Sequence, residues 1–405
     1  MHIIFISTEF LSEPSHGGLA HYLNRVVRYL SSQGHEVAVI TPSDQESVLR
    51  HNGAVTVHRL RQSKFSRVVG RLPLVGLFRG VTGCIDYSIR ACLRARRISM
   101  RKRVDLVQVA SIHGCGLFAL LFPVAPTVVR VSSYRPLCNK FHRIPLSADV
   151  RMIENLESLQ LRIARYIFCP SKMLAHLLAR KTGRQDIRQI ASTIYVEIDE
   201  SKFDWSVVAQ KLEKRVYLLF FGRLQLHKGI AVLTEALTSV LPKHPWLNVV
   251  FVGENGSTVV AEDMRLYIRS RLTAYAERLV FVDHLDHRTL YPVIKKAKLV
   301  VLPSLIENLP NACLEAMTLG RPVLGTRGTS FEEIIDDGTN GFLCRPGDAD
   351  DLAKTLNRAL RHPNLEGIGK CAQEKAAAFA PEKTVGKLLD FYEGVIAQQT
   401  QARKA

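Results

Sequence analysis

The chain has 405 residues, 47% of them apolar, which is more than one hydrophobic core accommodates, so we expect two domains of about 200 residues each. Its formal net charge of +18 indicates an anionic partner, either nucleic acid or a membrane surface. The eight cysteines show no Cys-x-x-Cys spacing, which argues against a disulfide or zinc scaffold and favours reduced thiols in a cytoplasmic protein.

The N-terminal residues MHIIFISTEF lack a basic leader, so no secretion signal is expected. The longest apolar run, residues 116–129, is interrupted by Pro123 and Pro126 and is shorter than the roughly 20 residues that a membrane-spanning helix needs. We therefore expect a cytoplasmic protein that is soluble or lies peripherally on the inner face of the cell membrane.

The first half of the chain alternates buried strands with amphipathic helices. A strand at 2–6 leads to Gly17 and Gly18, and the helix that follows over 19–32 ends at Gly34. A glycine pair before a helix often forms a simple turn, but it also lets the backbone approach a ligand. This alternation predicts an α/β fold with a doubly wound parallel sheet. Its further strands are expected at 36–41, 55–60, 104–110, 127–131 and 166–169.

Residues 62–103 interrupt the alternation with a basic insertion in which apolar and arginine residues are interleaved. Between Arg59 and Arg103 the sequence has one acidic residue, Asp86. One interpretation is an ordinary helix pair with a solvated basic face. The other is a surface for anionic lipid, to which each Lys or Arg near a bilayer contributes about 1 kcal/mol. Nucleic acid is disfavoured as a partner, because no recognition motif accompanies the charge.

The second half repeats the α/β pattern after a polar linker expected over 196–214. We therefore expect an N-terminal domain over 1–200, a C-terminal domain over 210–380, and a helix within 381–405 that packs back toward the N-terminal domain. The strands of this half are predicted at 216–221, 247–252, 279–282 and 299–302, and the helices at 229–241, 259–275, 287–297, 310–319, 348–361, 366–379 and 383–398.

The run LVVLPSLIENLPNACLEAMTLGRPVLG at 299–325 combines a buried strand, an acidic loop, a helix and a second strand. Pro310 suits the first turn of that helix, and Gly320 suits the position after its end. Glu307 precedes the helix and Glu315 lies inside it. Both carboxylates can therefore face one ligand-sized cleft at the carboxyl edge of the sheet, where open α/β sheets bind ligands. The alternative is that both are solvated surface residues.

Two cations follow the strand at 216–221. Arg223 comes after Gly222, and Lys228 comes before Gly229 at the start of a helix. Two fixed cations beside a helix N-terminus form a natural clamp for a diphosphate. They can equally be two exposed residues of a basic protein. After the next strand, Gly253 begins a Gly-x-x-Gly turn at which the backbone can approach a ligand.

These runs resemble the glutamate-x7-glutamate signature of the retaining family 4 glycosyltransferases, which have the GT-B fold. The resemblance rests on Glu307 and Glu315 within PSLIENLPNACLEAMTLGRPV, on FGRL with the Lys228-Gly229 pair, and on GHEV at 34–37. It is strong over 216–347 and loose over 42–165. It implies two Rossmann-like doubly wound domains facing across a cleft, an acceptor-side N-terminal domain and a C-terminal domain that binds the nucleotide sugar.

The resemblance also implies roles for these residues. Glu315 would bind the ribose hydroxyls, Glu307 would sit near the transferred sugar, and Arg223 with Lys228 would stabilise the leaving diphosphate. The backbone of Asn308, Leu309, Pro310 and Asn311 would meet donor oxygens, Gly253 would shape the nucleotide pocket, and Gly17 with Gly18 would approach the donor from the opposite domain. No metal and no cofactor is expected beside the nucleoside-diphosphate sugar.

The sequence departs from the family where a histidine usually contacts the sugar. Gln108 and Ala110 stand at those places, and His113 follows three residues after Ala110. His113 either replaces the usual histidine as a catalytic residue or is an ordinary loop histidine.

The resulting prediction is a retaining transferase that moves a hexose-type sugar from a nucleoside-diphosphate sugar to a glycan or glycolipid acceptor in bacterial surface polysaccharide or glycolipid assembly. One alternative is a non-catalytic protein that binds sugar nucleotides or membranes. Another is a dinucleotide-dependent enzyme, from the run Gly114-x-Gly116-x-x-Ala119, although the acidic residue that such a fingerprint needs is absent.

Overall fold

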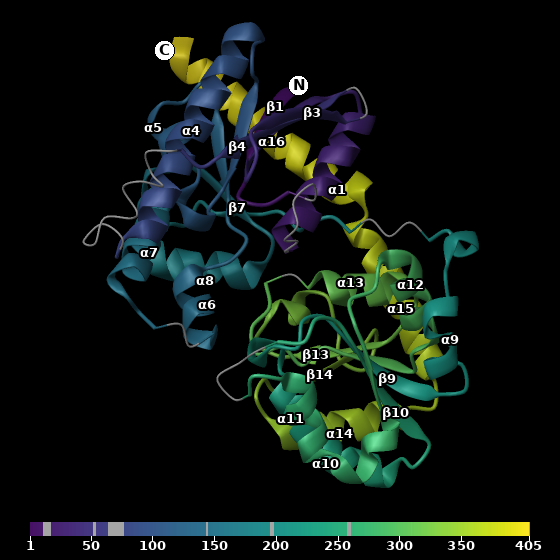
Figure 1. The fold of residues 1–405 in the computed structure, drawn as a ribbon. Coiled ribbons are helices and arrows are strands. Elements are labelled where there is room, and N and C mark those ends of the chain that lie inside the picture. Colours follow the sequence, from purple (N-terminus) through teal and green to yellow (C-terminus); the bar gives the residue numbers. More distant parts are fainter. Residues whose placement is uncertain are drawn as a thin grey trace. The chain divides into compact units, whose positions relative to one another are not determined.

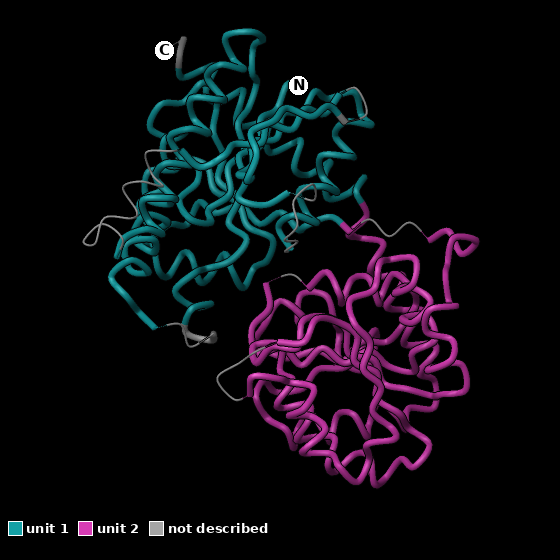
Figure 2. Tube along the Cα trace, in the orientation of Figure 1, with its two compact units in different colours: residues 1–140, 144–193, 381–405 teal, residues 141–143, 194–380 magenta. Residues whose placement is uncertain are grey.

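The structure is a computed structural model that describes residues 1–10, 18–51, 54–63, 77–142, 145–194, 198–256, 261–308 and 310–404. The chain divides into two compact units (Figure 2). Unit 1 comprises residues 1–140, 144–193 and 381–405, and unit 2 comprises 141–143 and 194–380.

Unit 1 is built on an eight-stranded sheet with the order β3-β4-β2-β1-β5-β6-β7-β8. Among these described strands the neighbours are parallel except β3 and β4, which are antiparallel. The predicted parallel sheet is therefore confirmed, while β3 and β8 were not predicted. The strands are β1 (His2–Ile6), β2 (Glu36–Ser43), β3 (Ser47–His51), β4 (Val55–Arg61), β5 (Leu106–Ala110), β6 (Thr127–Arg130), β7 (Tyr166–Cys169) and β8 (Arg188–Gln189).

Helices cover both faces of this sheet (Figure 1). Helices α4, α5 and α7 pack against one another on one side, and α1 and α16 pack against each other on the opposite side. The helices of this part are α1 (Gly18–Ser32), α4 (Arg79–Arg101), α5 (Leu117–Leu121), α6 (Arg135–His142), α7 (Ala148–Ile163), α8 (Lys172–Thr182) and α16 (Pro381–Lys404).

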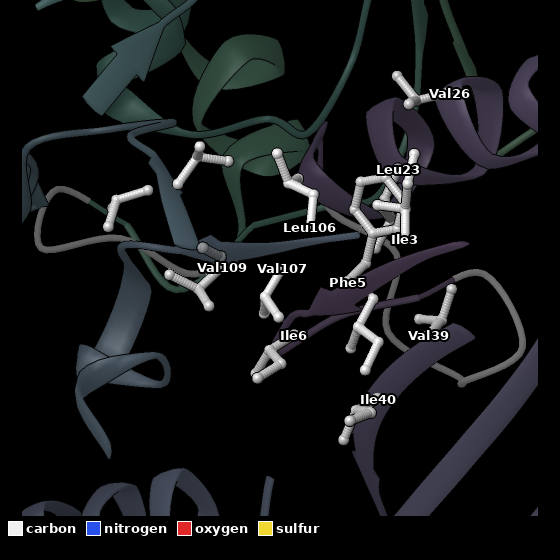
Figure 3. Packing of buried hydrophobic residues seen from close by; sticks show 14 of the residues in the cluster. Ile3, Phe5, Ile6, Leu23, Val26, Val39, Ile40, Leu106, Val107 and Val109 are labelled. Atoms are coloured by element: carbon white, nitrogen blue, oxygen red, sulfur yellow. The ribbon is translucent and has the colours of Figure 1, made fainter. Parts of the chain in front are cut away.

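The core of unit 1 lies between the sheet and these helices. All five residues of β1 are buried, as the continuous apolar run predicts for a central parallel strand. Ile3 and Phe5 share a cluster with Leu23 of α1 and with Val107 of β5 (Figure 3). Tyr392 of α16 is fully buried in the same cluster, so the C-terminal helix is part of this core.

Unit 2 contains a six-stranded parallel sheet with the order β11-β10-β9-β12-β13-β14. The four strands predicted from 216 to 302 are confirmed. The strands are β9 (Val216–Phe221), β10 (Leu247–Val252), β11 (Leu279–Val282), β12 (Leu299–Val301), β13 (Val323–Thr326) and β14 (Phe342–Cys344). The helices are α9 (Ser206–Leu212), α10 (Ile230–Val240), α11 (Met264–Arg271), α12 (His287–Lys296), α13 (Asn311–Thr318), α14 (Ala349–Leu360) and α15 (Leu365–Ala376).

Two predictions in this half are wrong in detail. The expected linker over 196–214 contains α9, whose Val208 and Leu212 are buried in the core of unit 2. The helix expected over 259–275 begins at Met264, because the Asp263 side chain accepts a hydrogen bond from the Leu266 N–H and so caps its start. Residues 259 and 260 of that prediction lie outside the described part of the chain.

Candidate functional site

Two segments of unit 2 meet at the carboxyl edge of its sheet, the turn that ends at Lys228 and the loop that follows β12. The Leu305 N–H donates a hydrogen bond of 2.8 Å to the His227 carbonyl. Gly229 has a φ of +75°, and a Cβ there would lie 1.8 Å from the Pro303 carbonyl oxygen. Only glycine lets the two backbones approach this closely.

This approach places the two predicted residues Lys228 and Glu307 in direct contact. The Lys228 Nζ donates to the Glu307 Oε2 at 2.6 Å, and the two side chains are 29% and 15% exposed. The Ser304 Oγ lies 3.4 Å from the same carboxylate oxygen. The Ser330 Oγ donates to the Glu307 carbonyl at 2.8 Å, which fixes the backbone of the loop. The result is a half-buried cation and anion side by side.

The nearby glycines bring β9 and β10 together at the same edge. Gly222 and Gly253 have φ values of +134° and +140°, and a Cβ on Gly253 would lie 2.2 Å from the Gly222 carbonyl oxygen. Arg223 follows this glycine contact and is exposed to solvent. The predicted residues Gly253 and Arg223 therefore lie at neighbouring strand ends, because β9 and β10 pair directly.

Helix α13 carries the second glutamate. It begins at Asn311, with Pro310 as its N-cap residue rather than inside its first turn. Glu315 is buried in this helix, with 7% of its surface exposed. Asn308 precedes the helix and is half-buried, and Leu309 lies outside the described residues. The burial of Glu315 contradicts the alternative that it is a solvated surface residue.

Unit 1 carries the remaining predicted residues. Gly18 is the exposed first residue of α1, and Gly17 lies outside the described residues. His113 sits in a short turn after β5 with a φ of +61°, which is uncommon for a residue other than glycine. Its backbone N–H donates to the Glu157 Oε1 at 2.7 Å, and Arg135 Nε donates to the same oxygen at 2.7 Å. Glu157 of α7 thus holds His113 in this conformation.

Sequence reasoning missed Ser330 and Glu157, which fix the two candidate loops. Ser330 follows β13 and reaches Glu307 only through the fold, and a single Glu in a helix gives no local signal.

Burial and Arg135 lower the pKa of His113 to about 4, so its imidazole is neutral near pH 7. Burial, with the nearby Arg94 and Arg101, lowers the pKa of His58 on β4 to about 4 as well.

These two histidines predict acid sensitivity of unit 1. Each takes up a proton near pH 6.5 when unfolded but only near pH 4 when folded, so stability is full above pH 6.5 and falls as the pH drops toward 4. We expect each to lower the unfolding free energy by about 1 to 3 kcal/mol across that window. Urea unfolding at pH 7, 6, 5 and 4.5 measures this loss. The His58→Gln, His113→Gln variant should show a flatter profile, and an unchanged slope would contradict the assignment.

The glycines of the alternative dinucleotide fingerprint serve packing. A Cβ on Gly116 would lie 2.3 Å from the Val109 side chain, and one on Gly114 would lie 2.6 Å from Leu156. Gly116 lets the start of α5 approach β5, and Gly114 lets the turn before α5 approach α7. Within the described ranges, no group of three or more His, Cys, Asp or Glu is arranged to hold a metal ion, and no helix is both long and apolar enough to cross a bilayer.

Comparison with known proteins places these features in a family. Residues 16–196 match the model of Glycosyltransferase Family 4, and residues 201–375 match that of Glycosyl transferases group 1. A D-inositol 3-phosphate glycosyltransferase of Catenulispora acidiphila is 30% identical over 180 residues, which covers 43% of this chain and 42% of that protein. The chain thus spans less than half the length of this curated relative.

Solved structures share the fold over the whole chain. Sucrose-phosphate synthase from Thermosynechococcus elongatus has a TM-score of 0.76 at 19% identity, covering 98% of this chain and 99% of that one. Anabaena HepE, solved in complex with UDP-glucose, has a TM-score of 0.65 at 18% identity, covering 99% and 100%. This likeness confirms the expected GT-B fold of two α/β units with parallel sheets. Since the two family models together match most of its residues, the chain belongs to the group 1 glycosyltransferases of family 4.

Proposed function

We propose that the protein is a retaining glycosyltransferase that moves a hexose-type sugar from a nucleoside-diphosphate sugar to a glycan or lipid-linked acceptor, in the assembly of a bacterial surface polysaccharide or glycolipid. The observation that carries the proposal is the contact between Lys228 and Glu307 at the carboxyl edge of unit 2. A cation and a carboxylate held 2.6 Å apart suit a donor whose diphosphate is anionic and whose sugar carbon becomes cationic during transfer.

The donor would bind to unit 2. Arg223 and Lys228 would neutralise the diphosphate, with the start of α10 contributing its N–H groups. Gly253 would leave space for the nucleotide, and Glu315 would accept hydrogen bonds from the ribose hydroxyls. Asn308 and Asn311 flank the start of α13, where their backbone N–H groups would meet donor oxygens. No metal ion is part of this proposal, because two cations already face the diphosphate.

The transfer would proceed with charge separation at the anomeric carbon. The bond between that carbon and the diphosphate oxygen breaks, and both of its electrons leave with the diphosphate. The acceptor hydroxyl attacks from the same face, and its proton passes to the departing diphosphate oxygen. Glu307 would stabilise the oxocarbenium-like sugar, and Lys228 would stabilise the leaving group. His113, neutral and fixed by Glu157, would contact the sugar or acceptor from unit 1.

One name among the comparisons supports a nucleotide-sugar donor, because HepE was solved with UDP-glucose. The Catenulispora relative is named as a glycosyltransferase for an inositol phosphate, which does not identify its donor. A soluble or membrane-bound acceptor remains compatible with both. We favour a lipid-linked acceptor because of the net charge of +18.

Nucleotide binding tests the donor site. The Arg223→Ala variant should bind UDP, GDP or ADP about tenfold to a hundredfold more weakly than the wild type, since a charge-assisted hydrogen bond to phosphate is worth roughly 1.5 to 3 kcal/mol. Isothermal titration calorimetry of the full chain measures the difference. Arg361→Ala is the matched control, because Arg361 is an exposed arginine at the C-terminal end of α14. Equal affinity in the Arg223 variant and the wild type would remove Arg223 from the site.

A non-catalytic protein that binds sugar nucleotides is the alternative. It predicts the same calorimetric result but no turnover of any donor. Glu307 favours the enzyme, because a carboxylate beside the diphosphate weakens anion binding and has value only in the reaction.

A further inference from the structure

Three neighbouring helices of unit 1 expose large apolar side chains to solvent. We call this surface the three-helix face and define it by the outward residues of α4, α5 and α7. Phe122, directly after α5, and Met100 of α4 are 59% and 73% exposed. A soluble surface tolerates single exposed apolar residues, but a contiguous group indicates an interaction site. The exposed apolar residues of the face are Ile89, Leu93, Met100, Leu121, Phe122, Met152, Leu159 and Ile163.

Packing places the three helices that carry these residues next to one another. The Phe118 N–H donates to the Ser88 Oγ at 3.2 Å, and the Cys92 Sγ lies 3.9 Å from the Phe122 carbonyl, so α5 lies along α4. The Gln160 side chain of α7 accepts from the Gly116 N–H at 2.7 Å, so α7 adjoins α5. Figure 1 shows the three helices on the same side of the sheet. Along α4 the exposed positions 89, 93, 96 and 100 recur at helical spacing and form one stripe.

The exposed charges of this face are all positive. The acidic residues of α4 and α7 are each turned to partners within the fold. Asp149 accepts hydrogen bonds from the Gly80 and Val81 N–H groups, and Asp86 accepts one from the Ser63 N–H. Glu154 binds the Asn139 side chain, and Glu157 holds His113. The exposed charged residues of α4 and α7 are Arg79, Arg96, Arg97, Arg101, Arg151 and Arg162.

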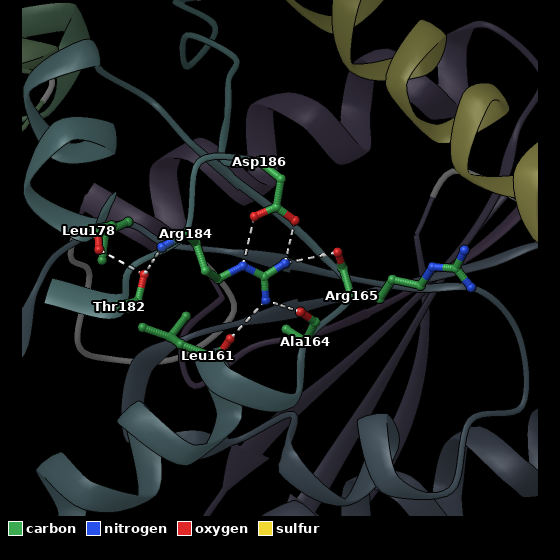
Figure 4. Close-up of polar contacts among 7 residues, drawn as sticks. All are labelled: Leu161, Ala164, Arg165, Leu178, Thr182, Arg184 and Asp186. Atoms are coloured by element: carbon green, nitrogen blue, oxygen red, sulfur yellow. Dashed lines mark hydrogen bonds and ion pairs between the residues drawn. The ribbon is translucent and has the colours of Figure 1, made fainter. Parts of the chain in front are cut away.

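Other arginines of this region have structural partners and are not part of the face. Arg90 and Arg94 of α4 both form ion pairs with Glu46, at 3.2 and 2.6 Å. Arg184 donates to the carbonyls of Leu161 and Arg165 at the end of α7 and pairs with Asp186 (Figure 4). Residues 64–76 of the basic insertion expected from sequence lie outside the described part of the chain, and its described residues, 62–63 and 77–103, are divided between two roles. Part of its charge stabilises the fold, and the outward part joins residues from α5 and α7 that lie outside the insertion.

We propose that the three-helix face binds the surface of an anionic lipid bilayer. Arginines attract the negative headgroups, while Leu, Ile, Met and Phe side chains between them enter the boundary with the acyl chains. A nucleic acid would leave the exposed aliphatic side chains without a role. The bilayer accounts for both features of the surface.

The location of the face fits a lipid-linked acceptor, so the inference rests on the proposed function. Helix α7 carries Met152 and Leu159 on its outer side and Glu157 on its inner side. Since Glu157 holds His113, the turn that carries His113 lies one helix away from the proposed bilayer surface. When unit 1 is bound in this way, His113, which is proposed to contact the acceptor, would lie near the bilayer that holds the lipid-linked acceptor.

Vesicle flotation of the full chain tests this inference. We expect binding to vesicles in which phosphatidylglycerol replaces roughly a third of the phosphatidylcholine, little binding to phosphatidylcholine alone, and weaker binding as salt rises. The Arg96→Ala, Arg97→Ala variant should bind about tenfold to thirtyfold more weakly. Leu93→Ser, Phe122→Ser should reduce binding at unchanged charge. The matched control is Leu266→Ser, Arg361→Ala on unit 2, in which Leu266 is 64% exposed, and it should float like the wild type.

Three results would overturn the inference: binding that ignores lipid charge, variants of the face that float like the wild type, or self-association through the face without vesicle binding. Calorimetry with nucleoside diphosphates on the same variants separates the two proposals. Intact nucleotide binding with no lipid binding would refute the bilayer surface alone. Lipid binding by a protein that binds no nucleotide would refute the proposed function alone.

Discussion

The Glu307→Gln variant is expected to bind nucleoside diphosphate several-fold more tightly than the wild type while it turns over the donor about a hundredfold to a thousandfold more slowly. The Lys228 ammonium is paired with the Glu307 carboxylate at 2.6 Å, so removing the charge of Glu307 frees the cation for the diphosphate. The same change removes the anion that would face the oxocarbenium-like sugar. Calorimetry gives the affinity, and release of nucleoside diphosphate from a nucleotide sugar gives the rate.

Lys228→Met provides the contrast for this prediction. It should weaken both nucleotide affinity and turnover, because the ammonium acts on the diphosphate in the ground state and during departure. The turnover of the Glu307→Gln, Lys228→Met double variant should fall by less than the two single effects combined. Each single substitution leaves its partner as an uncompensated half-buried charge, whereas the double substitution leaves none. A Glu307→Gln variant that loses affinity and rate in parallel would show that Glu307 serves the loop structure and not the reaction.

The second large effect is expected at Gly229, where a Cβ would lie 1.8 Å from the Pro303 carbonyl oxygen. Gly229→Ala should lower the unfolding free energy of unit 2 by about 3 kcal/mol or more, because a positive φ is strained for alanine and a backbone atom must also move. It should further weaken nucleotide binding, since the displaced loop carries Glu307. Urea unfolding followed by intrinsic fluorescence measures the stability.

Gly338→Ala is the matched control. Gly338 has a φ of +81°, close to that of Gly229, but nothing lies within 4 Å of the position of a Cβ there. Its substitution should cost only the conformational strain, about 1 kcal/mol, and leave nucleotide affinity unchanged. Equal destabilisation by the two substitutions would mean that the approach of Gly229 to Pro303 does not hold the loops together.

The sequence predicted the central strands because their signal is local. Val216–Phe221 is a continuous apolar run, Leu247–Val252 is apolar except for Asn248, and both strands form where expected. Strand β3 was missed because residues 47–51, SVLRH, mix polar and apolar residues and are ordered by antiparallel pairing with β4. The α9 segment was predicted to be part of a linker because polar residues surround it, yet Val208 and Leu212, one helical turn apart, are buried and form its inner side.

The candidate site was likewise predictable from the sequence only in part. The glutamates, the two cations and the glycines could be located from their spacing and from the family resemblance. The contact between Lys228 and Glu307 could not, because it joins residues 79 positions apart through the approach of Gly229 to Pro303. The left-handed conformation of His113 also had no local signal, since Glu157, 44 positions later, imposes it. The three-helix face could not be predicted either, because only the fold determines which arginines pair with other residues and which face the solvent.

Donor turnover tests the central claim most directly. The full chain is incubated with a panel of UDP-, GDP- and ADP-sugars, and the nucleoside diphosphate released from each is quantified beside a Lys228→Met control. We expect the wild type to turn over at least one donor and Lys228→Met to lose most of this activity. Release from no donor above the level of the Lys228→Met control would contradict the proposed transferase activity.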